Sequence, residues 1–381
     1  MDKQNYTLKD LKSQDVKKIF DEANDRIEEK LKSKNLINRK RILKDYKILI
    51  KAMYLYIIDS LSYQRLSDIM KCKYNITMSD TAWRNKITKA IPSFFDTAKE
   101  YLDEVLAKQS KEKSKDIMKK YRCYALDATN LPIEGEHCTV IRVHTQYELN
   151  FDCLKYALIT DSHTAESTTL FTIEKDAVYM ADRAYATSKQ MVHIIVKNAD
   201  FIMRFSPSHI VFYEDAEFKT KINIHEKISA LDSFHQKCYI KYQSQSFPVT
   251  IIGKKKPVEK HTKSEKKVRD RARKNQQKVS QKTIDYSKWL FVVTSLDETL
   301  SDEIIEFYRL RWQIELFFKR AKSLLNFHKI KHSYSKHRKL IVALWFAVAF
   351  NICSIKIRLV NQFDLNISEY NLFSLIIYLI S

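Results

Sequence analysis

The sequence predicts an α/β protein in which a mixed β-sheet is preceded by a helical region and followed by further helices. Three observations support this prediction. Residues 1–112 are rich in charge with helical spacing of apolar residues, residues 113–335 alternate strand-like runs with helices, and residues 336–381 are apolar and helical in pattern. A chain of 381 residues with 45% hydrophobic residues is long enough to bury a sizeable core.

The charge balance points to the class of partner. The net charge of +21 indicates a polyanion, and because no lipidation motif accompanies it, we expect double-stranded DNA and no membrane. The most apolar run, LIVALWFAVAFNICSI, is short for a membrane span and contains Asn351, so it is expected to be a buried helix. The six cysteines lack paired spacing and the N-terminus lacks an apolar h-region, which together favour the bacterial cytosol.

The N-terminal region contains a pattern typical of a helix-turn-helix at about 62–90. The first helix has an apolar stripe formed by Tyr63, Leu66 and Ile69, and Ser79 is placed to cap the second helix. Arg84 on the second helix is expected to lie near a DNA backbone. Two amphipathic helices around a turn are common, so this pattern fits DNA binding or ordinary packing.

Strand-like runs dominate the next part of the chain. They are expected at residues 121–126, 139–147, 153–160, 177–181 and 201–205, with a helix at 188–198. Three strands followed by a strand–helix–strand unit predict a mixed sheet. Shorter strand-like pieces at 210–213, 238–242 and 249–252 follow, and a further strand is expected at 287–296.

A strongly basic segment, residues 253–283, is called the basic arm. It holds 13 Lys or Arg residues and three acidic residues. This composition fits a solvated or disordered loop, and it also fits an arm lying along phosphates through residues such as Lys254, Arg271 and Arg273. The two interpretations are compatible because such arms often become ordered only on binding. The chain has only two glycines, Gly135 and Gly253, which excludes glycine-rich phosphate loops.

Two aspartates follow strand-like runs. Asp127 follows residues 121–126 and Asp182 follows residues 177–181. Acids at the carboxyl ends of strands lie where α/β sheets bind ligands. Taken singly, each is more simply a turn aspartate, as is Asp161 after YALIT.

A third carboxylate belongs to the helix expected at residues 307–325, FYRLRWQIELFFKRAKSLL. At 100° per residue, an arc about 60° wide beside the apolar face holds Tyr308, Arg311, Glu315 and Lys322. Alone, this arc fits a solvated face with one Arg–Glu pair. Beside the two aspartates, it predicts a site of three carboxylates.

Three converging carboxylates repel by about 4 kcal/mol per pair at about 4 Å unless they are protonated or hold divalent cations. Hard oxygen ligands in that number suit Mg²⁺, with Mn²⁺ as a substitute, and two such ions bind the attacking and leaving oxygens of a phosphodiester. Arg311 and Lys322 would then hold the flanking phosphates.

These residues resemble bacterial insertion-sequence transposases of the DDE class, in the group marked by a Y-x2-R-x3-E-x6-K helix. The signature is complete from Tyr308 to Lys322, and YALDATNLP and ADRAYA match the two aspartate motifs. The resemblance covers about residues 60–335 and implies a ribonuclease H-like catalytic domain at 113–335, interrupted by a mostly β insertion at 206–288. The family usually has D-R-G-Y where this chain has Ala184. If that position needs a positive φ, alanine costs about 1 kcal/mol there.

The resemblance implies a DNA transposase that cleaves element ends and joins 3′-hydroxyls to target DNA, with Asp127, Asp182 and Glu315 as catalytic residues holding two Mg²⁺ ions. We expect further DNA contacts from Arg183 and Tyr185. Trp289 lies where some members stack a flipped base, although a core tryptophan in a strand fits equally. A homodimer is expected when two ends are paired. Two alternatives remain: a transposase-derived DNA-binding protein without catalysis, and a ribonuclease H-like nuclease without strand transfer.

Overall fold

In the computed structural model of the chain, the described residues are 13–35, 43, 45–109, 118, 120–131, 141–296, 301–324 and 335–363. The chain divides into two compact units, each built from separated segments. The first unit comprises Met1–Ser114, Ala128–Ala165 and Gln313–Ser381, and the second comprises Lys115–Asp127 and Glu166–Trp312. The expected helix-turn-helix pattern lies within the described residues, whereas residues 139–140 of the second expected strand and residues 364–381 of the expected C-terminal helical region lie outside them.

An eight-stranded mixed sheet confirms the predicted α/β class. Its order is β3-β2-β1-β4-β5-β8-β7-β6. The strands are β1 Arg122–Leu131, β2 Ile141–Glu148, β3 Cys153–Asp161, β4 Ala177–Ala181, β5 Asp200–Arg204, β6 Ser233–Tyr242, β7 Gln245–Lys255 and β8 Trp289–Thr294. The piece expected at 210–213 is not a strand, because there only Tyr213 forms isolated bridges, to Lys221 and Tyr239.

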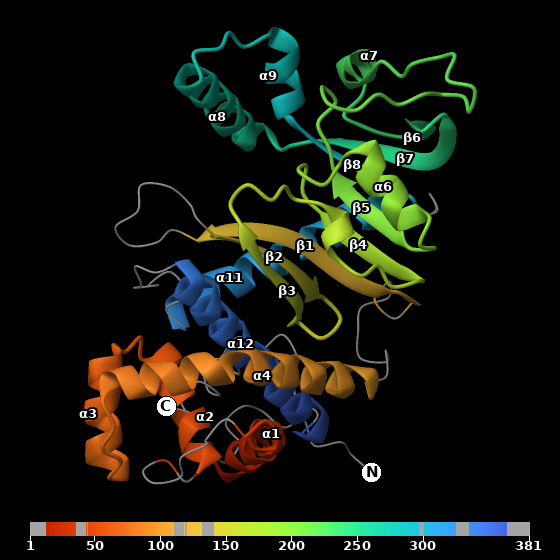
Figure 1. Cartoon of the computed structure of the whole chain (residues 1–381). Coiled ribbons are helices and arrows are strands. Elements are labelled where there is room, and N and C mark those ends of the chain that lie inside the picture. Colours follow the sequence, from red (N-terminus) through yellow and green to blue (C-terminus); the bar gives the residue numbers. More distant parts are fainter. Residues whose placement is uncertain are drawn as a thin grey trace. The chain divides into compact units, whose positions relative to one another are not determined.

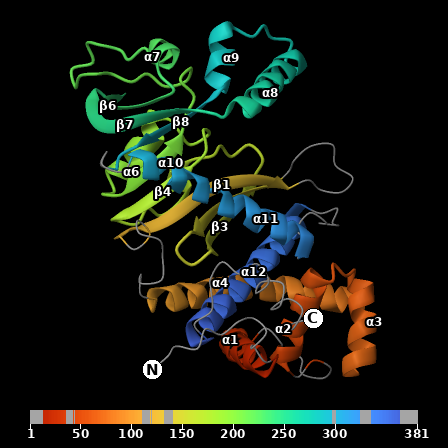
Figure 2. The same cartoon turned by 180° about the vertical axis from the view of Figure 1, so that it is seen from behind.

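The first unit packs helices around the antiparallel pair β2–β3. Its helices are α1 Ser13–Ser33, α2 Tyr46–Ile58, α3 Tyr63–Tyr74, α4 Asp80–Ala107, α11 Trp312–Leu324 and α12 Ser335–Phe363. The first residue of α11, Trp312, is counted with the second unit. Figures 1 and 2 show α12 crossing the long helix α4. The Asn351 amide on α12 donates to the Tyr54 hydroxyl at 2.5 Å and to Asn24 Oδ1 at 3.3 Å, which ties α12 to α2 and α1.

Helix α12 contains the most apolar run of the sequence. Its segment His337–Phe363 is long and apolar enough to cross a membrane, yet 89% of its most apolar window is buried inside the structure. The expected buried helix is therefore present, and it packs on α4 as a core element.

Helices α3 and α4 lie where the helix-turn-helix was expected. The Ser79 side chain accepts a hydrogen bond from the Ala82 backbone N–H and caps α4, and Asn75 ends α3 in the left-handed conformation. Tyr63 and Leu66 are buried as predicted, but Met70 rather than Ile69 completes the stripe. Whether these helices bind DNA stays a prediction.

The second unit holds the central strands. β1 pairs with β4 in parallel and β4 with β5 in parallel, whereas β8 is antiparallel to both β5 and β7. One face of these strands carries α6 Ser188–Ile195 (Figure 1), and the opposite face carries α10 Ser301–Leu310 (Figure 2).

The segment 206–288 is less β-rich than expected. Besides β6 and β7 it contains helices α7 Ile224–Ala230, α8 His261–Lys274 and α9 Gln281–Ser287, with a short 3₁₀ turn, Val258–Lys260, before α8. Its strands extend the main sheet, because β7 pairs with β8. The basic arm is thus largely folded, and Figure 1 shows α8 and α9 lying side by side.

The signature helix is also different from the prediction. A single helix was expected at residues 307–325, but α10 ends at Leu310 and α11 begins at Trp312. Between them the Arg311 N–H donates to the Tyr308 carbonyl at 3.2 Å, a tighter i to i−3 turn. One helical wheel therefore does not describe Tyr308 and Lys322 together.

Candidate functional site

Asp127 on β1 and Asp182, the residue that follows the neighbouring strand β4, lie at the same level of the sheet. The parallel pairing of β1 with β4 ends at Leu126 opposite Ala181, and each aspartate is the next residue. Neighbouring strands are about 4.8 Å apart, so the two carboxylates arise from adjacent backbones. The expectation that Asp127 ends its strand is wrong, because β1 continues to Leu131, although its pairing with β4 stops before Asp127.

A tight turn orients the carboxylate of Asp182. The Ala184 N–H donates to Asp182 Oδ1 at 3.2 Å, and the Tyr185 N–H donates to the Asp182 carbonyl at 3.1 Å. Ala184 is not among the residues with a positive φ. The alanine that replaces the usual glycine therefore introduces no left-handed strain, and its side chain is compatible with the turn that holds Asp182.

Tyr308, near the end of α10, lies within electrostatic reach of both Asp182 and Arg311. Burial raises the pKa of Tyr308, the positive charge of Arg311 opposes that rise, and the Asp182 carboxylate adds to it. The Arg311 guanidinium carbon lies 5.7 Å from the centre of the Tyr308 ring, a cation–π contact. Tyr308 is therefore a neutral, buried phenol beside a cation.

The remaining signature residues belong to the first unit. Glu315 is exposed on α11 and Lys322 is half-buried two turns later. Ile314 and Phe317 hold α11 in place, with Ile314 fully buried and the Phe317 ring 5.4 Å from the Tyr147 ring. The structure thus groups Asp127, Asp182, Tyr308 and Arg311 in the second unit, and it places Glu315 and Lys322 in the first.

The two aspartates fit a divalent cation by their chemistry. Carboxylate oxygens are the ligands that Mg²⁺ and Mn²⁺ prefer, and two of them arise here from adjacent strands. Within the described parts of the chain, no three His, Cys, Asp or Glu side chains are grouped for one ion. Asp161 differs from the pair, because its Oδ1 accepts from the N–H groups of His163 and Thr164 in an ordinary aspartate turn.

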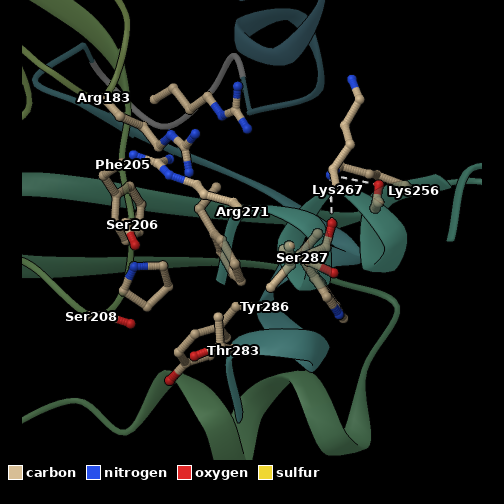
Figure 3. Close-up of a pocket in the computed structure, with 16 residues that line it drawn as sticks. Arg183, Phe205, Ser206, Ser208, Lys256, Lys267, Arg271, Thr283, Tyr286 and Ser287 are labelled. Carbon is tan, nitrogen blue, oxygen red and sulfur yellow. Dashed lines mark hydrogen bonds between the residues drawn. The ribbon is translucent and has the colours of Figure 1, made fainter. Parts of the chain in front are cut away.

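A basic cavity of about 400 Å³ lies in the second unit. Figure 3 shows its lining, in which Arg183 and Arg271 direct their guanidinium groups to the same wall. The cationic lining residues are Arg183, Arg204, Lys256, Lys267 and Arg271. The sequence predicted Arg183 and Arg271 as DNA contacts, but it did not single out Arg204, Lys256 or Lys267. Arg204 carries one usable signal, since it is a cation at the end of a buried strand.

The other residues expected to contact DNA occupy varied positions. Tyr185 is completely buried at 0% exposure, and Trp289 is 4% exposed with its ring parallel to Phe291 at 6.0 Å. Trp289 nevertheless lines the basic cavity, so it is a core tryptophan that also forms a cavity wall. Arg84 is half-buried on α4, whereas Lys254 on β7 is exposed. Arg273 on α8 is exposed and forms an ion pair with Asp270 at 3.2 Å.

Comparison with known proteins places the chain among transposases. The family model described as transposase DDE domain matches residues 118–352. The transposase for insertion sequence element IS421 of Escherichia coli is 25% identical over 240 residues, which cover 59% of this chain and 62% of the relative. A protein named InsL for insertion sequence element IS186A, from Escherichia coli strain K12, is also 25% identical over 240 residues, covering 59% of this chain and 63% of the relative.

A solved structure is also similar. The cryo-EM structure of the piggyBac transposase synaptic complex with hairpin DNA gives a TM-score of 0.47 at 8% sequence identity, covering 95% of this chain and 77% of that one. The match to the curated relatives spans less than two thirds of their length. The family match covers more than half of this chain and includes both aspartates and the signature helices, so the chain belongs to the transposase DDE domain family, as a transposase of the bacterial insertion-sequence type.

Proposed function

We propose that this chain binds the ends of an insertion sequence, cleaves them by metal-dependent phosphodiester hydrolysis and joins the 3′-hydroxyl ends to target DNA. The observation that carries the proposal is the placement of Asp127, on β1, beside Asp182, the residue that follows β4, in a chain of the transposase DDE domain family. The strand order β3-β2-β1-β4-β5, antiparallel in β2–β3 and parallel from β1 to β5, is the arrangement expected of a ribonuclease H-like sheet and supports the same proposal.

Asp127, Asp182 and Glu315 are the residues that would hold two Mg²⁺ ions, or Mn²⁺ as a substitute. When bound, such ions lower the pKa of water and stabilise negative charge on phosphodiester oxygens. The chain's own contribution is to hold carboxylates at fixed positions: β1 and β4 fix the backbones of two, and the Ala184 N–H fixes the orientation of one. Glu315 on α11 supplies the third carboxylate of the proposed site.

Cationic and neutral donors would position the DNA strand. Arg311 is held against the Tyr308 ring, so its guanidinium is oriented for a phosphate before DNA arrives. The Tyr308 phenol stays protonated because burial raises its pKa, so it is a donor and not an anion that would repel DNA. Lys322 on α11 would hold a further phosphate.

Binding to double-stranded DNA would draw on surfaces beyond this site. The exposed cations of the folded basic arm and the second helix of the α3–α4 pair are the proposed DNA-contacting surfaces. Because two ends must be cut together, we propose a homodimer in the complex with DNA, acting in the bacterial cytosol.

A strand-transfer assay separates this function from its two alternatives. With pre-cleaved element ends, target DNA and Mg²⁺, we expect the purified chain to form joined products. A nuclease without strand transfer would nick uncleaved ends but form no joined product. A DNA-binding protein without catalysis would shift the ends in a gel and produce neither. Each outcome assigns one function, so the absence of joined products would contradict the proposal.

Substitution of two cations, Arg311 between α10 and α11 and Lys322 on α11, gives a second test. Replacing either residue by Ala is expected to slow cleavage about 10- to 100-fold, because a charge-assisted contact contributes about 1.5–3 kcal/mol. The matched control is Arg309→Ala, since Arg309 lies two residues before Arg311, is exposed and forms an ion pair with Glu306 at 2.6 Å. Cleavage rates and melting temperatures are measured together. If Arg311→Ala and Lys322→Ala cleave like Arg309→Ala, these cations are a solvated surface and do not hold the substrate.

A further inference from the structure

We propose that the basic cavity of the second unit is a binding site for a phosphate group, carried by a nucleic acid strand or free in solution. The site is distinct from the proposed metal site, because neither Asp127 nor Asp182 lines it. It rests on five cations brought together from four elements, on the fixed position of the Lys256 ammonium group and on the lack of acidic residues in the cavity wall.

The wall of the cavity offers hydrogen-bond donors and positive charge. Arg183 follows β4, Arg204 ends β5, Lys256 follows β7, and Lys267 and Arg271 lie one turn apart on α8. No Asp or Glu lines the cavity, while hydroxyls are contributed by Ser206, Ser208, Ser264, Thr283 and Ser287. Charged and hydroxyl donors of this kind bind a phosphate group.

The ammonium group of Lys256 is held in position before any ligand binds. Its Nζ donates to the Ser287 carbonyl at 2.6 Å and lies 3.4 Å from Ser264 Oγ, and Figure 3 draws both contacts as dashed lines. Its own carbonyl lies 2.7 Å from Nε2 of His261, the first residue of α8. These contacts link the end of β7 to α8 and α9, so the cavity wall is pre-organised.

The charges of the cavity are not neutralised within the described part of the chain. None of the five cations forms an ion pair there, whereas their neighbours on α8 do: Glu265 pairs with Lys288 at 3.1 Å and Asp270 pairs with Arg273. Burial, and to a smaller extent the charges of the nearby Arg204, Arg183, Lys267 and Lys260, together lower the pKa of Lys256 to about 8. A dianion in the cavity would relieve this repulsion.

Aromatic side chains in the cavity wall strengthen the attraction between the cations and a phosphate. Trp289 is buried, and Phe205, Tyr286 and Phe291 complete the apolar part of the lining. Such walls lower the local dielectric constant around the half-buried Arg204 and Lys256, so the attraction of these two cations to a phosphate is stronger than on an open surface. A volume of about 400 Å³ admits a phosphate together with part of the group that carries it.

Binding is tested by calorimetric titration of the full chain with orthophosphate, without metal, at constant ionic strength. Lys256→Met is expected to weaken binding at least about 10-fold, because it removes one charge-assisted contact. The matched control is Lys255→Met, because Lys255 is exposed and pairs with Asp232 at 2.7 Å. Arg271→Gln with the control Arg269→Gln on the same helix repeats the comparison at a site where the fold does not depend on the side chain.

The protonation of Lys256 gives a second readout. For this readout the ligand is methyl phosphate, because a phosphate monoester has a second pKa of about 6 and stays a dianion between about pH 7.5 and 9.5. Because burial lowers the pKa of Lys256 to about 8, wild-type affinity should be highest near pH 7.5 and fall as the lysine loses its proton. In Lys256→Met this part of the decrease should disappear.

Competition with short single strands identifies the source of the phosphate. Displacement only by a 5′-phosphorylated strand assigns the site to a strand end, and equal displacement by a 5′-hydroxyl strand assigns it to backbone phosphate. The proposal is overturned if the wild type binds neither orthophosphate nor the strands at millimolar concentration, or if Lys256→Met and Arg271→Gln bind like their controls. The readout is binding without metal, so it fails or succeeds independently of cleavage.

Discussion

Asp182→Asn is expected to reduce DNA cleavage below about 1% of the wild-type rate, because loss of a metal ligand removes several kcal/mol of transition-state stabilisation and about 2.7 kcal/mol is a factor of 100. Asparagine keeps the oxygen that accepts from the Ala184 N–H, so the turn should survive. DNA affinity should stay within about twofold, since binding depends on contacts with cations. A nicking assay and a gel shift on the same substrate measure both quantities.

Asp161→Asn is the matched control for this substitution. Asp161 is also an aspartate at a strand end, but its carboxylate closes a turn, and a backbone hydrogen bond from His163 lowers its pKa. Its replacement should leave cleavage nearly unchanged. Asp127→Asn and Glu315→Gln should behave like Asp182→Asn. Cleavage near the wild-type rate in any of these three variants would remove that residue from the proposed site.

The sequence predicted the strands well where burial is continuous. β4 has the expected bounds because all five of its residues are buried between the two faces of the sheet. β1 is longer than expected, since its polar second half, after Leu126, continues the strand past the pairing with β4. Hydrophobic patterns find buried strands and miss polar extensions that depend on neighbouring strands.

Sequence patterns did not predict the break between α10 and α11 or the folding of the basic arm. The break occurs at a single residue, Arg311, which is a good helix former, so no local signal marks it. The arm has the composition of a disordered segment, yet it folds. Ser280 caps α9, and the ion pair between Lys288 and Glu265 fixes α8 against the base of β8. The ion pair joins residues more than 20 positions apart, which composition does not reveal.

The basic cavity also could not be predicted from the sequence. Arg204 and Lys256 are 52 positions apart in sequence, and they meet only because β8 lies between β5 and β7 in the sheet. The aspartates could be predicted because each follows a recognisable strand. A cavity lined from four elements could not, because its position depends on the strand order.

The largest expected change in stability comes from Lys356→Met in the first unit. Lys356 lies on α12 and is 4% exposed, and its Nζ donates to Asp152 Oδ2 at 2.5 Å and to the Asp152 carbonyl at 2.9 Å. The Tyr147 hydroxyl donates to Asp152 Oδ1 at 2.7 Å, and Arg320 on α11 lies 3.7 Å from Oδ2. This network fixes the β2–β3 turn to α12 and to the helix that carries Glu315.

Removing the lysine leaves a largely enclosed carboxylate without its closest cation, so we expect a loss of about 3–5 kcal/mol in the free energy of unfolding. Urea denaturation measures it, with Lys319→Met on the exposed face of α11 as a control that should change stability by no more than about 0.5 kcal/mol. Adding Asp152→Asn should recover part of the loss, because the uncompensated charge is then gone while the acceptor oxygen for Tyr147 remains. If the two substitutions are additive, the carboxylate and the ammonium are not coupled, and the position of α11 must depend on the packing of Ile314 and Phe317 instead.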